Sequence, residues 1–384
     1  MTQPNRTSAM VAGEASGDLL GSHLMEALKQ EMPEVRFVGI GGPKMHAAGM
    51  EVLFSMEKLA VRGYVEVLRH YFEIVGIRRK LRAQFSDNPP DLFIGVDAPD
   101  FNLGLELALK QRGVPIVHYV SPSIWAWRGE RIHKIKQAVS HMLALFPFEA
   151  PLYEKAGVPV TYVGHPLADM LPDMPNRTAM REQMRLSKQA KIFALLPGSR
   201  QSEVRQLAAT YIETAKLIFH KLPDAQFLVP LVSRETRIIF EYELYRCEAQ
   251  ELPITILFGN AHDAVIAADG VLVASGTATL EAALLKRPMV ITYKMPGFTW
   301  WLSKRKKYQP YVGLPNILAG KFKVPELLQE DATPENLAQA LLNLVNDKDA
   351  VARLEESFTA LHLTLRQNTA QKAAAAILPY LRTA

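Results

Sequence analysis

Residues 10–28, MVAGEASGDLLGSHLMEAL, pass from an apolar run through a turn of small residues into an amphipathic pattern, which is the order strand, turn, helix. The same order returns at residues 192–218, IFALLPGSRQSEVRQLAATYIETAKLI. Short apolar runs alternate with helical patterns along most of the chain, which predicts an α/β fold with parallel sheets. The predicted strands are residues 8–13, 35–41, 91–97, 114–120, 141–146, 160–165, 191–197, 226–232, 254–259, 270–275 and 287–293.

The domain organisation follows from the chain length and from one break in this alternation. With 384 residues the length of the chain predicts two or three domains. Between His165 and Lys191 it becomes polar and contains three prolines, which indicates a linker. We therefore predict two Rossmann-like domains followed by amphipathic helices. The predicted boundaries are 1–168 for the N-terminal domain, 169–190 for the linker, 191–350 for the C-terminal domain, and 351–384 for helices that pack back on the N-terminal domain.

The composition excludes several classes of protein. Hydrophobic residues make up 48% and charged residues 22%, as in soluble globular proteins, so neither a disordered chain nor a multi-span membrane protein is expected. The single cysteine, Cys247, excludes an intrachain disulfide and a cysteine zinc cluster. We find no export signal at the N-terminus and no apolar stretch of about 18 residues, and a reducing cytosol fits best. The net charge of +5 is compatible with nucleotides, anionic lipids or nucleic acid, and selects none of them.

Two polar clusters follow predicted strands of the first domain, where ligands of open α/β sheets bind. The first, GEASGD at residues 13–18, contains Glu14 and Ser16 in a turn whose backbone N–H groups can approach an anion or a sugar. The second, GVDAPDFN at residues 95–102, places Asp97 directly after a strand and Asp100 three residues later. A carboxylate there can be a general base, and the alternative is an aspartate that caps the following helix.

A third cluster in the first domain is YVSPSIWAWR, residues 119–128. It contains Ser121 and Trp125 in a loop that follows a strand. Exposed tryptophans are costly unless they are packed or used for binding, so this loop is either a binding element or ordinary packing.

The second domain contributes two further clusters. LPGSRQSEV, residues 196–204, runs from a Gly-Ser-Arg turn into a helix, an arrangement that suits a diphosphate; Ser199 supplies a donor and Arg200 a cation. VASGTATLEAALLKRP, residues 273–288, supplies phosphate donors at the start of another helix, and Glu281 within it suits a ribose. The alternatives are a solvent-exposed arginine and a glutamate that only favours the helix N-terminus. The donors in the second cluster are Ser275, Gly276 and Thr277.

Two surface segments combine apolar and basic residues. In residues 64–82 an apolar helical face that includes Val67 and Leu68 adjoins five cations, a composition that suits an interfacial helix. In residues 295–308 Trp300 and Trp301 precede four consecutive cations. Either segment can instead be core with a solvated rim, and basic patches with aromatic residues also bind single-stranded nucleic acid.

Metal chemistry has no support in the sequence. It contains no Walker A motif and no H-E-x-x-H motif, and the ten histidines are scattered. The only D-x-D motif, at residues 347–349, lies in a polar turn between predicted helices. We therefore predict no metal site and no cofactor.

Taken in order, these motifs resemble the lipid-A-disaccharide synthase family of inverting glycosyltransferases, which have the GT-B fold. The resemblance extends from about residue 9 to residue 320. It rests on AGEASGDLLG (12–21), GVDAPDFN (95–102), YVSPSIWAWR (119–128), VGHPLAD (163–169), LPGSR (196–200), SGTATLEAAL (275–284) and LPNILAG (314–320).

The resemblance implies two Rossmann-like domains that face a cleft, with the last helix crossing back. It implies UDP-2,3-diacylglucosamine as donor, 2,3-diacylglucosamine 1-phosphate as acceptor, and the β-1,6-linked lipid A disaccharide 1-phosphate and UDP as products. It also implies a homodimer and a location on the cytoplasmic face of a Gram-negative inner membrane, whose anionic surface the protein contacts. Asn316, in the last motif, and Glu14 are site candidates by this match alone.

The residues support the mechanism separately. UDP is a good leaving group, so the transfer needs one base and donors for the diphosphate, with no acid carboxylate and no metal. We assign Asp97 as the base, and Arg200, Ser199, Ser275 and Thr277 to the diphosphate.

Two alternative functions remain to be compared with this interpretation. A UDP-sugar 2-epimerase of the same architecture would account for Glu281 and the diphosphate turns, although it would not need the apolar basic segments. A non-catalytic RNA-binding protein would account for the charge but not for the clusters at the strand ends; we expect no nucleic-acid partner.

Overall fold

The computed structural model describes residues 6–59, 64–126, 129–295 and 310–382, without the side chains of residues 64–71. Contacts within the chain divide it into two compact units. The first contains residues 1–169 and 365–384, and the second contains residues 170–364. The chain therefore ends in the unit in which it began. Each unit has its own parallel sheet and its own apolar core.

The first unit is built on a seven-stranded sheet in the order β3-β2-β1-β4-β5-β6-β7. Its strands are β1 (Thr7–Ala12), β2 (Arg36–Gly41), β3 (Met50–Ser55), β4 (Leu92–Val96), β5 (Ile116–Tyr119), β6 (His141–Ala144) and β7 (Val160–Tyr162). The chain runs outward from β1 to β3, returns to β4 beside β1, and then runs outward on the other side. Ligands of open α/β sheets bind at such a switch point, so the turns after β1 and β4 are the first place to look for a site.

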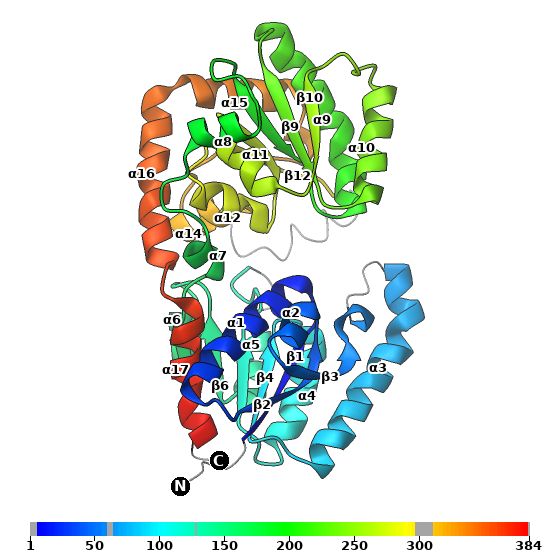
Figure 1. Ribbon diagram of the computed structural model, residues 1–384, viewed down its shortest axis with the longest axis vertical. Helices are drawn as coiled ribbons and strands as arrows, with labels where there is room; N and C mark the ends of the chain where they lie inside the picture. Colours follow the sequence, from blue (N-terminus) through cyan, green and yellow to red (C-terminus); the bar gives the residue numbers. More distant parts are fainter. Residues whose placement is uncertain (1–5, 60–63, 127–128, 296–309, 383–384) are drawn as a thin grey trace. The chain divides into compact units, whose positions relative to one another are not determined.

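Helices cover both faces of this sheet (Figure 1). They are α1 (Ala15–Glu31), α2 (Pro43–Ala47), α3 (Tyr64–Asp87), α4 (Pro99–Lys110), α5 (Arg131–Ala138), α6 (Ala150–Ala156), α7 (Pro166–Met170) and α17 (Thr369–Arg382). The C-terminal helix α17 lies beside α1, and Ile377 joins Leu24 in the core on that face. The described parts of α3 and α4 pack on the other face, where Leu81 and Leu105 meet Phe93.

The second unit is built on a six-stranded sheet in the order β10-β9-β8-β11-β12-β13. Its strands are β8 (Ile192–Leu196), β9 (Gln226–Leu231), β10 (Ile254–Phe258), β11 (Gly270–Ala274), β12 (Met289–Tyr293) and β13 (Glu326–Leu328). All its strand pairs are parallel, and β8 beside β11 forms a second switch point.

The helices of the second unit are α8 (Arg177–Gln183), α9 (Gln201–Lys221), α10 (Arg234–Arg246), α11 (Ala261–Ala267), α12 (Thr277–Leu284), α14 (Leu314–Ala319), α15 (Pro334–Asn346) and α16 (Lys348–Leu365). α9, α10 and α15 bury one face of the sheet, with Tyr211, Phe240 and Leu341 in the core. Thr333 caps α15: its hydroxyl accepts a hydrogen bond from the backbone N–H of Asn336, and Pro334 opens the helix.

The predicted α/β class and all the predicted strands are confirmed. Two strands at sheet edges were not predicted. β3 is only partly buried, and β13 has three residues, so neither gives a continuous apolar run.

The division into units differs from the predicted boundaries in two places. The second unit begins at Met170, and the segment predicted as a linker packs within it. Arg181 on α8 is buried: its guanidinium donates to the Ala267 carbonyl at 2.8 Å and to Asp269 at 2.7 Å. At the other end, α16 groups with the second unit, and only residues 365–384 group with the first.

Candidate active site

The switch point of the first unit brings Glu14 and Asp97 together. Ala12 pairs with Val96 as the last residues of β1 and β4, so the two turns leave the sheet side by side. A Cβ at Gly13 would lie 2.9 Å from the Cβ of Ala98, which requires a very small residue in the first turn. Ser16 lies two residues after Glu14 and is exposed in the first turn of α1.

Asp97 is held by its backbone. Its N–H donates to the Tyr119 carbonyl at 2.8 Å, and its own carbonyl accepts from Asn102 Nδ2 at 2.8 Å. Asp97 and Ala98 have φ values of 52° and 44°, a left-handed conformation that residues other than glycine, asparagine and aspartate rarely adopt and that clusters at functional sites. Burial raises the pKa of Asp97, the charge of His118 opposes this, and the charge of Glu14 adds to it.

A hollow of about 300 Å³ lies beside Asp97 in the first unit. Asp100, Ser121 and Arg131 also line it. The N-cap of α4 is Ala98, and the Asp100 carboxylate instead pairs with the guanidinium of Arg131. Arg131 was not predicted as a site residue, because nothing in the sequence indicates that the start of α5 comes back to Asp100.

Trp125 contacts a buried carboxyl group, and Ser121 contacts a buried tyrosine hydroxyl group. Trp125 Nε1 donates to Glu149 Oε1 at 3.2 Å, and the indole packs edge-on against Phe148 with the ring centroids 5.2 Å apart. The hydroxyl groups of Ser121 and Tyr153 are 2.7 Å apart. These contacts favour the packing alternative for Trp125, whereas Ser121 still lines the hollow beside Asp97.

Burial raises the pKa of Glu149 from 4.5 to about 7, against the hydrogen bonds of Phe146 N–H and Trp125, which lower it. A raised pKa means that the folded state binds a proton more tightly than the unfolded chain. The contribution of Glu149 to the free energy of unfolding is therefore fully present below about pH 4.5 and is lost as the pH rises through 7. The free energy of unfolding falls by on the order of 3 kcal/mol across this range.

We expect Glu149→Gln to become more stable relative to the wild type as the pH rises from about 5 to about 8. Urea unfolding of both proteins at the two pH values measures this difference. The wild-type curve alone is not sufficient, because burial lowers the pKa of His165 to about 4, and that group gains stability with rising pH. A constant difference between variant and wild type would contradict the prediction.

In the second unit, the turns after β8 and β11 are neighbours, since Val273 pairs with Leu196. Ser199 and Arg200 are exposed in the first turn, at the N-terminus of α9. Their backbone N–H groups donate to Glu203 Oε2 at 3.0 and 3.2 Å, and Arg200 lies 3.6 Å from Glu203 Oε1. The carboxylate of Glu203 therefore occupies the donors assigned to a diphosphate, and a phosphate bound there has to displace it.

The turn after β11 keeps part of its polar surface exposed. Gly276, with φ 150°, and Thr277 are exposed at the N-terminus of α12, whereas the Ser275 hydroxyl donates to the Val312 carbonyl at 2.9 Å. Glu281 lies in the next turn of this helix, with its Oε2 3.1 Å from His262 Nε2. The hydrogen bond to Glu281 is the main cause of a raised pKa of His262.

Asn316 is fully buried and uses its whole hydrogen-bonding capacity inside the second unit. Its Nδ2 donates to the Val324 carbonyl at 2.9 Å and to Glu326 Oε1 at 2.8 Å. Its Oδ1 accepts from the N–H groups of Lys323 and Val324 at 2.7 and 3.0 Å. Two donor and two acceptor sites are all that an amide offers, so the structure gives Asn316 an organising role in this turn.

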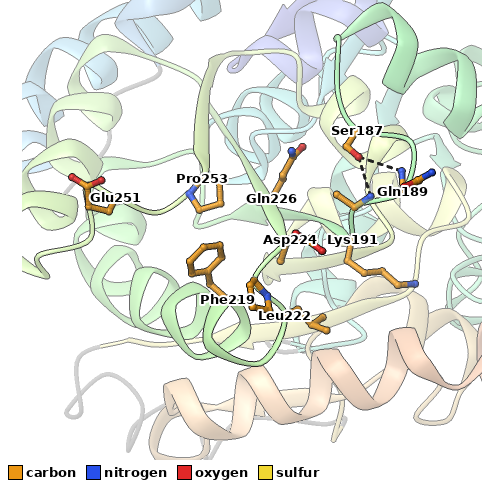
Figure 2. A pocket seen from close by; sticks show the side chains of 12 residues that line it. Ser187, Gln189, Lys191, Phe219, Leu222, Asp224, Gln226, Glu251 and Pro253 are labelled. Atoms are coloured by element: carbon orange, nitrogen blue, oxygen red, sulfur yellow. Dashed lines mark hydrogen bonds between the residues drawn. The ribbon is translucent and has the colours of Figure 1, made fainter.

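A larger hollow, of about 700 Å³, lies at the opposite edge of the second sheet (Figure 2). It is lined by residues before β8, β9 and β10, among them Lys191, Asp224 and Glu251. These strand ends are the amino ends, whereas ligands of parallel sheets bind at the carboxyl ends. Ser187 Oγ accepts from the N–H groups of Gln189 and Ala190. We therefore do not assign the nucleotide to this hollow, because of its place at the amino ends of the strands.

Comparison with known proteins decides the identity of the chain. The family model for lipid-A-disaccharide synthetase matches residues 8–378. A lipid-A-disaccharide synthase of Methylobacillus flagellatus is 61% identical over 376 residues, which is 98% of this chain and all of that protein. The chain belongs to the lipid-A-disaccharide synthase family.

Membership in the lipid-A-disaccharide synthase family makes the chain a glycosyltransferase, and the predicted formation of the lipid A disaccharide is confirmed. Two solved structures share the fold at low identity and over nearly the whole of both chains. A UDP-GlcNAc 2-epimerase from Neisseria meningitidis is 11% identical, with a TM-score of 0.63, and the match covers 98% of this chain and 99% of that one. Acinetobacter baumannii MurG is 15% identical, with a TM-score of 0.60, and the match covers 98% of this chain and 100% of that one.

These likenesses show the GT-B fold alone, and the epimerase alternative is less well supported than the synthase. Within the part of the chain that the structure describes, no group of three or more metal-ligating side chains comes together. Among the same residues, no helix is both long enough and apolar enough to cross a bilayer.

The two predicted surface segments of this synthase are only partly described. The side chains of Val67 and Leu68 lie outside the described residues, as do residues 296–308, including Trp300 and Trp301. In the described part of the first segment, Ile77 and Leu81 belong to the core, so residues 77–81 fit the alternative of core with a solvated rim. Phe72, nearer the start of the helix, is exposed.

Proposed function

We propose that this synthase transfers 2,3-diacylglucosamine from UDP-2,3-diacylglucosamine to 2,3-diacylglucosamine 1-phosphate, with Asp97 as the base. The observation that carries the proposal is Asp97 itself, fixed in a left-handed conformation at a topological switch point and facing a hollow. The products are the β-1,6-linked disaccharide 1-phosphate and UDP.

The reaction needs little from the protein besides the base and anion donors. The Asp97 carboxylate takes the proton of the acceptor 6-hydroxyl while that oxygen forms the bond to the donor C1. The bond between C1 and the diphosphate oxygen breaks, and UDP leaves with its electron pair. Attack opposite the leaving group inverts C1, and since UDP is a good leaving group, no acid is required.

The acceptor is assigned to the hollow of the first unit. Arg131 lines it together with Asp97, and its guanidinium suits the 1-phosphate of the acceptor by charge and by its paired donors. Asp100 is its present partner and would yield to a dianion. Glu14, Ser16 and Ser121 lie around the same switch point and are proposed to contact the sugar.

The donor is assigned to the switch point of the second unit. The N-terminus of α12 at Gly276 and Thr277 presents backbone donors, and Arg200 supplies a cation nearby. Glu281, oriented by His262, is proposed to accept the ribose hydroxyls.

The acyl chains of both substrates reside in a lipid surface, and we propose that the enzyme works on the anionic cytoplasmic face of the inner membrane. Support comes from the exposed basic residues Arg79 and Lys80 on α3, since each cation near such a surface contributes about 1 kcal/mol of binding. The described end of the apolar face carries Phe72, which is 82% exposed.

The test is incubation of the purified protein with labelled UDP-2,3-diacylglucosamine, with and without the monosaccharide acceptor, in EDTA. We expect labelled disaccharide and UDP only when the acceptor is present, at a rate that EDTA does not change, because Arg and N–H groups can stabilise the leaving diphosphate. Release of an epimerised sugar without acceptor would favour the 2-epimerase reaction. Loss of turnover that magnesium or manganese specifically restores would contradict metal independence.

A further inference from the structure

A buried acid and base pair lies directly behind Asp97. His118 on β5 and Glu106 on α4 are both fully buried, and His118 Nδ1 is 2.6 Å from Glu106 Oε1. His118 pairs with Gly95, two residues before Asp97 on the neighbouring strand. Paired residues of neighbouring strands face the same side of the sheet, so His118 lies on the side to which a Cβ of Gly95 would point. Asp97 follows the end of β4, and the charge of His118 acts on its carboxyl group.

The missing side chain of Gly95 leaves space for the carboxylate of Glu106. A Cβ at Gly95 would lie 2.0 Å from Glu106 Oε1, and any larger residue would expel Glu106 from the contact with His118. Asn102, one turn before Glu106 on α4, donates to the Asp97 carbonyl and to the Val11 carbonyl. The same helix therefore fixes both the backbone of Asp97 and the partner of His118.

The pair is expensive to maintain, which argues against a merely structural role. Two charges buried together gain little over apolar residues of similar size. Among the described residues, neither Glu106 Oε2 nor His118 Nε2 has a hydrogen-bond partner, although both atoms are buried. Unsatisfied polar atoms of this kind cost free energy that an apolar pair at these positions would avoid.

We propose that His118 and Glu106 form a positioning pair, in which the imidazolium of His118, held by Glu106, keeps Asp97 in the carboxylate form that accepts the acceptor's proton. The inference rests on the proposed role of Asp97 as base. Burial alone lowers the pKa of His118, but the charge and hydrogen bond of Glu106 outweigh it, with a contribution from Asp97, and the net direction is upward. The charge of His118 in turn lowers the pKa of Asp97 against its burial.

Other charged groups face Asp97 from the neighbouring elements. Glu14 on the turn after β1 opposes ionisation, whereas Asp100 and Arg131 neutralise each other across the hollow. On α3, the guanidinium of Arg78 lies over Gly104 of α4. Among these groups, His118 is therefore the buried cation that lowers the pKa of Asp97, and removing its charge should change that pKa most.

The test is the pH dependence of kcat/KM for the full-length enzyme and for the variants Glu106→Gln and His118→Gln. In both variants we expect the acidic limb of the kcat/KM profile to move to higher pH by about one unit. At a given pH on that limb, kcat/KM should then be about tenfold lower than in the wild type, and it should recover at alkaline pH. The KM for the donor should not change. The double variant should shift no further than either single one, because the two residues act as a unit.

Asp91→Asn is the matched control, because it removes an ion pair with Arg6 just before β4, at the far end of the same strand. It should lower the melting temperature without moving the acidic limb. Glu106→Asp, which keeps the charge, should restore part of the wild-type profile. If His118→Gln does not fold, the nearly isosteric Glu106→Gln decides the matter.

Two outcomes separate this inference from the proposal on which it rests. A limb that stays in place in both variants while Asp97→Asn is inactive would overturn the positioning pair and leave Asp97 as the base. Wild-type turnover in Asp97→Asn would overturn the base and the pair together.

Discussion

Asp97→Asn is expected to fold normally and to lose turnover by roughly 10² to 10⁴-fold, the usual contribution of a positioned general base. Asparagine is nearly isosteric and, like aspartate, tolerates the left-handed conformation that the structure has at this position. The backbone hydrogen bonds to Tyr119 and Asn102 do not involve the carboxylate and should persist. What is lost is the ability to accept a proton, so kcat should fall while donor binding changes little.

Asp100→Asn is the matched control in the same turn. Its carboxylate is exposed and pairs with Arg131, so its removal should affect acceptor KM more than kcat. Steady-state kinetics of both variants, with thermal melts to exclude unfolding, provide the comparison. Turnover near the wild-type value in Asp97→Asn, or a larger kcat loss in Asp100→Asn, would remove Asp97 from the proposed mechanism.

The sequence was sufficient for the sheets because their central strands are buried on both faces. Strands such as β4 and β8 read as continuous apolar runs, and the polar turns after them had to lie at the carboxyl edge. Two of the four edge strands gave no such signal, since β3 is partly exposed and β13 has only three residues. The segment after His165 is polar and proline-rich, and one buried cation, Arg181, ties it to the second unit through Asp269, a contact that no local pattern can reveal.

The sequence could identify only those site residues that directly follow the end of a strand. Asp97 and Thr277 follow strand ends, and the sequence places them there directly. Arg131, His118 and Glu106 reach the same site through contacts between distant elements, so periodicity alone could not select them. Glu203 is different, because an acidic residue three positions into a helix is a recognisable capping signal, and its competition for the N–H groups of Ser199 and Arg200 could have been predicted.

The second large effect concerns stability and decides the role of Asn316. In Asn316→Asp the Oδ1 position can still accept from Lys323 and Val324, but the second oxygen then faces the Val324 carbonyl and the carboxylate of Glu326 where an amide donated before. Two hydrogen bonds are replaced by repulsion, and a buried charge is left uncompensated, which costs about 3 to 5 kcal/mol.

We therefore expect a clearly lower urea midpoint for Asn316→Asp, with the deficit shrinking at acidic pH as the introduced carboxylate is protonated. Asn336→Asp, at an exposed position in the same unit, should change stability by less than about 0.5 kcal/mol. Glu326 also accepts from the N–H groups of Val312 and Gly313, and Ser275 donates to the Val312 carbonyl, so loss of the amide should loosen the turn beside the proposed diphosphate site. Donor affinity would then fall together with stability. A variant that keeps the wild-type midpoint and loses only UDP affinity would instead show that Asn316 contacts the donor directly.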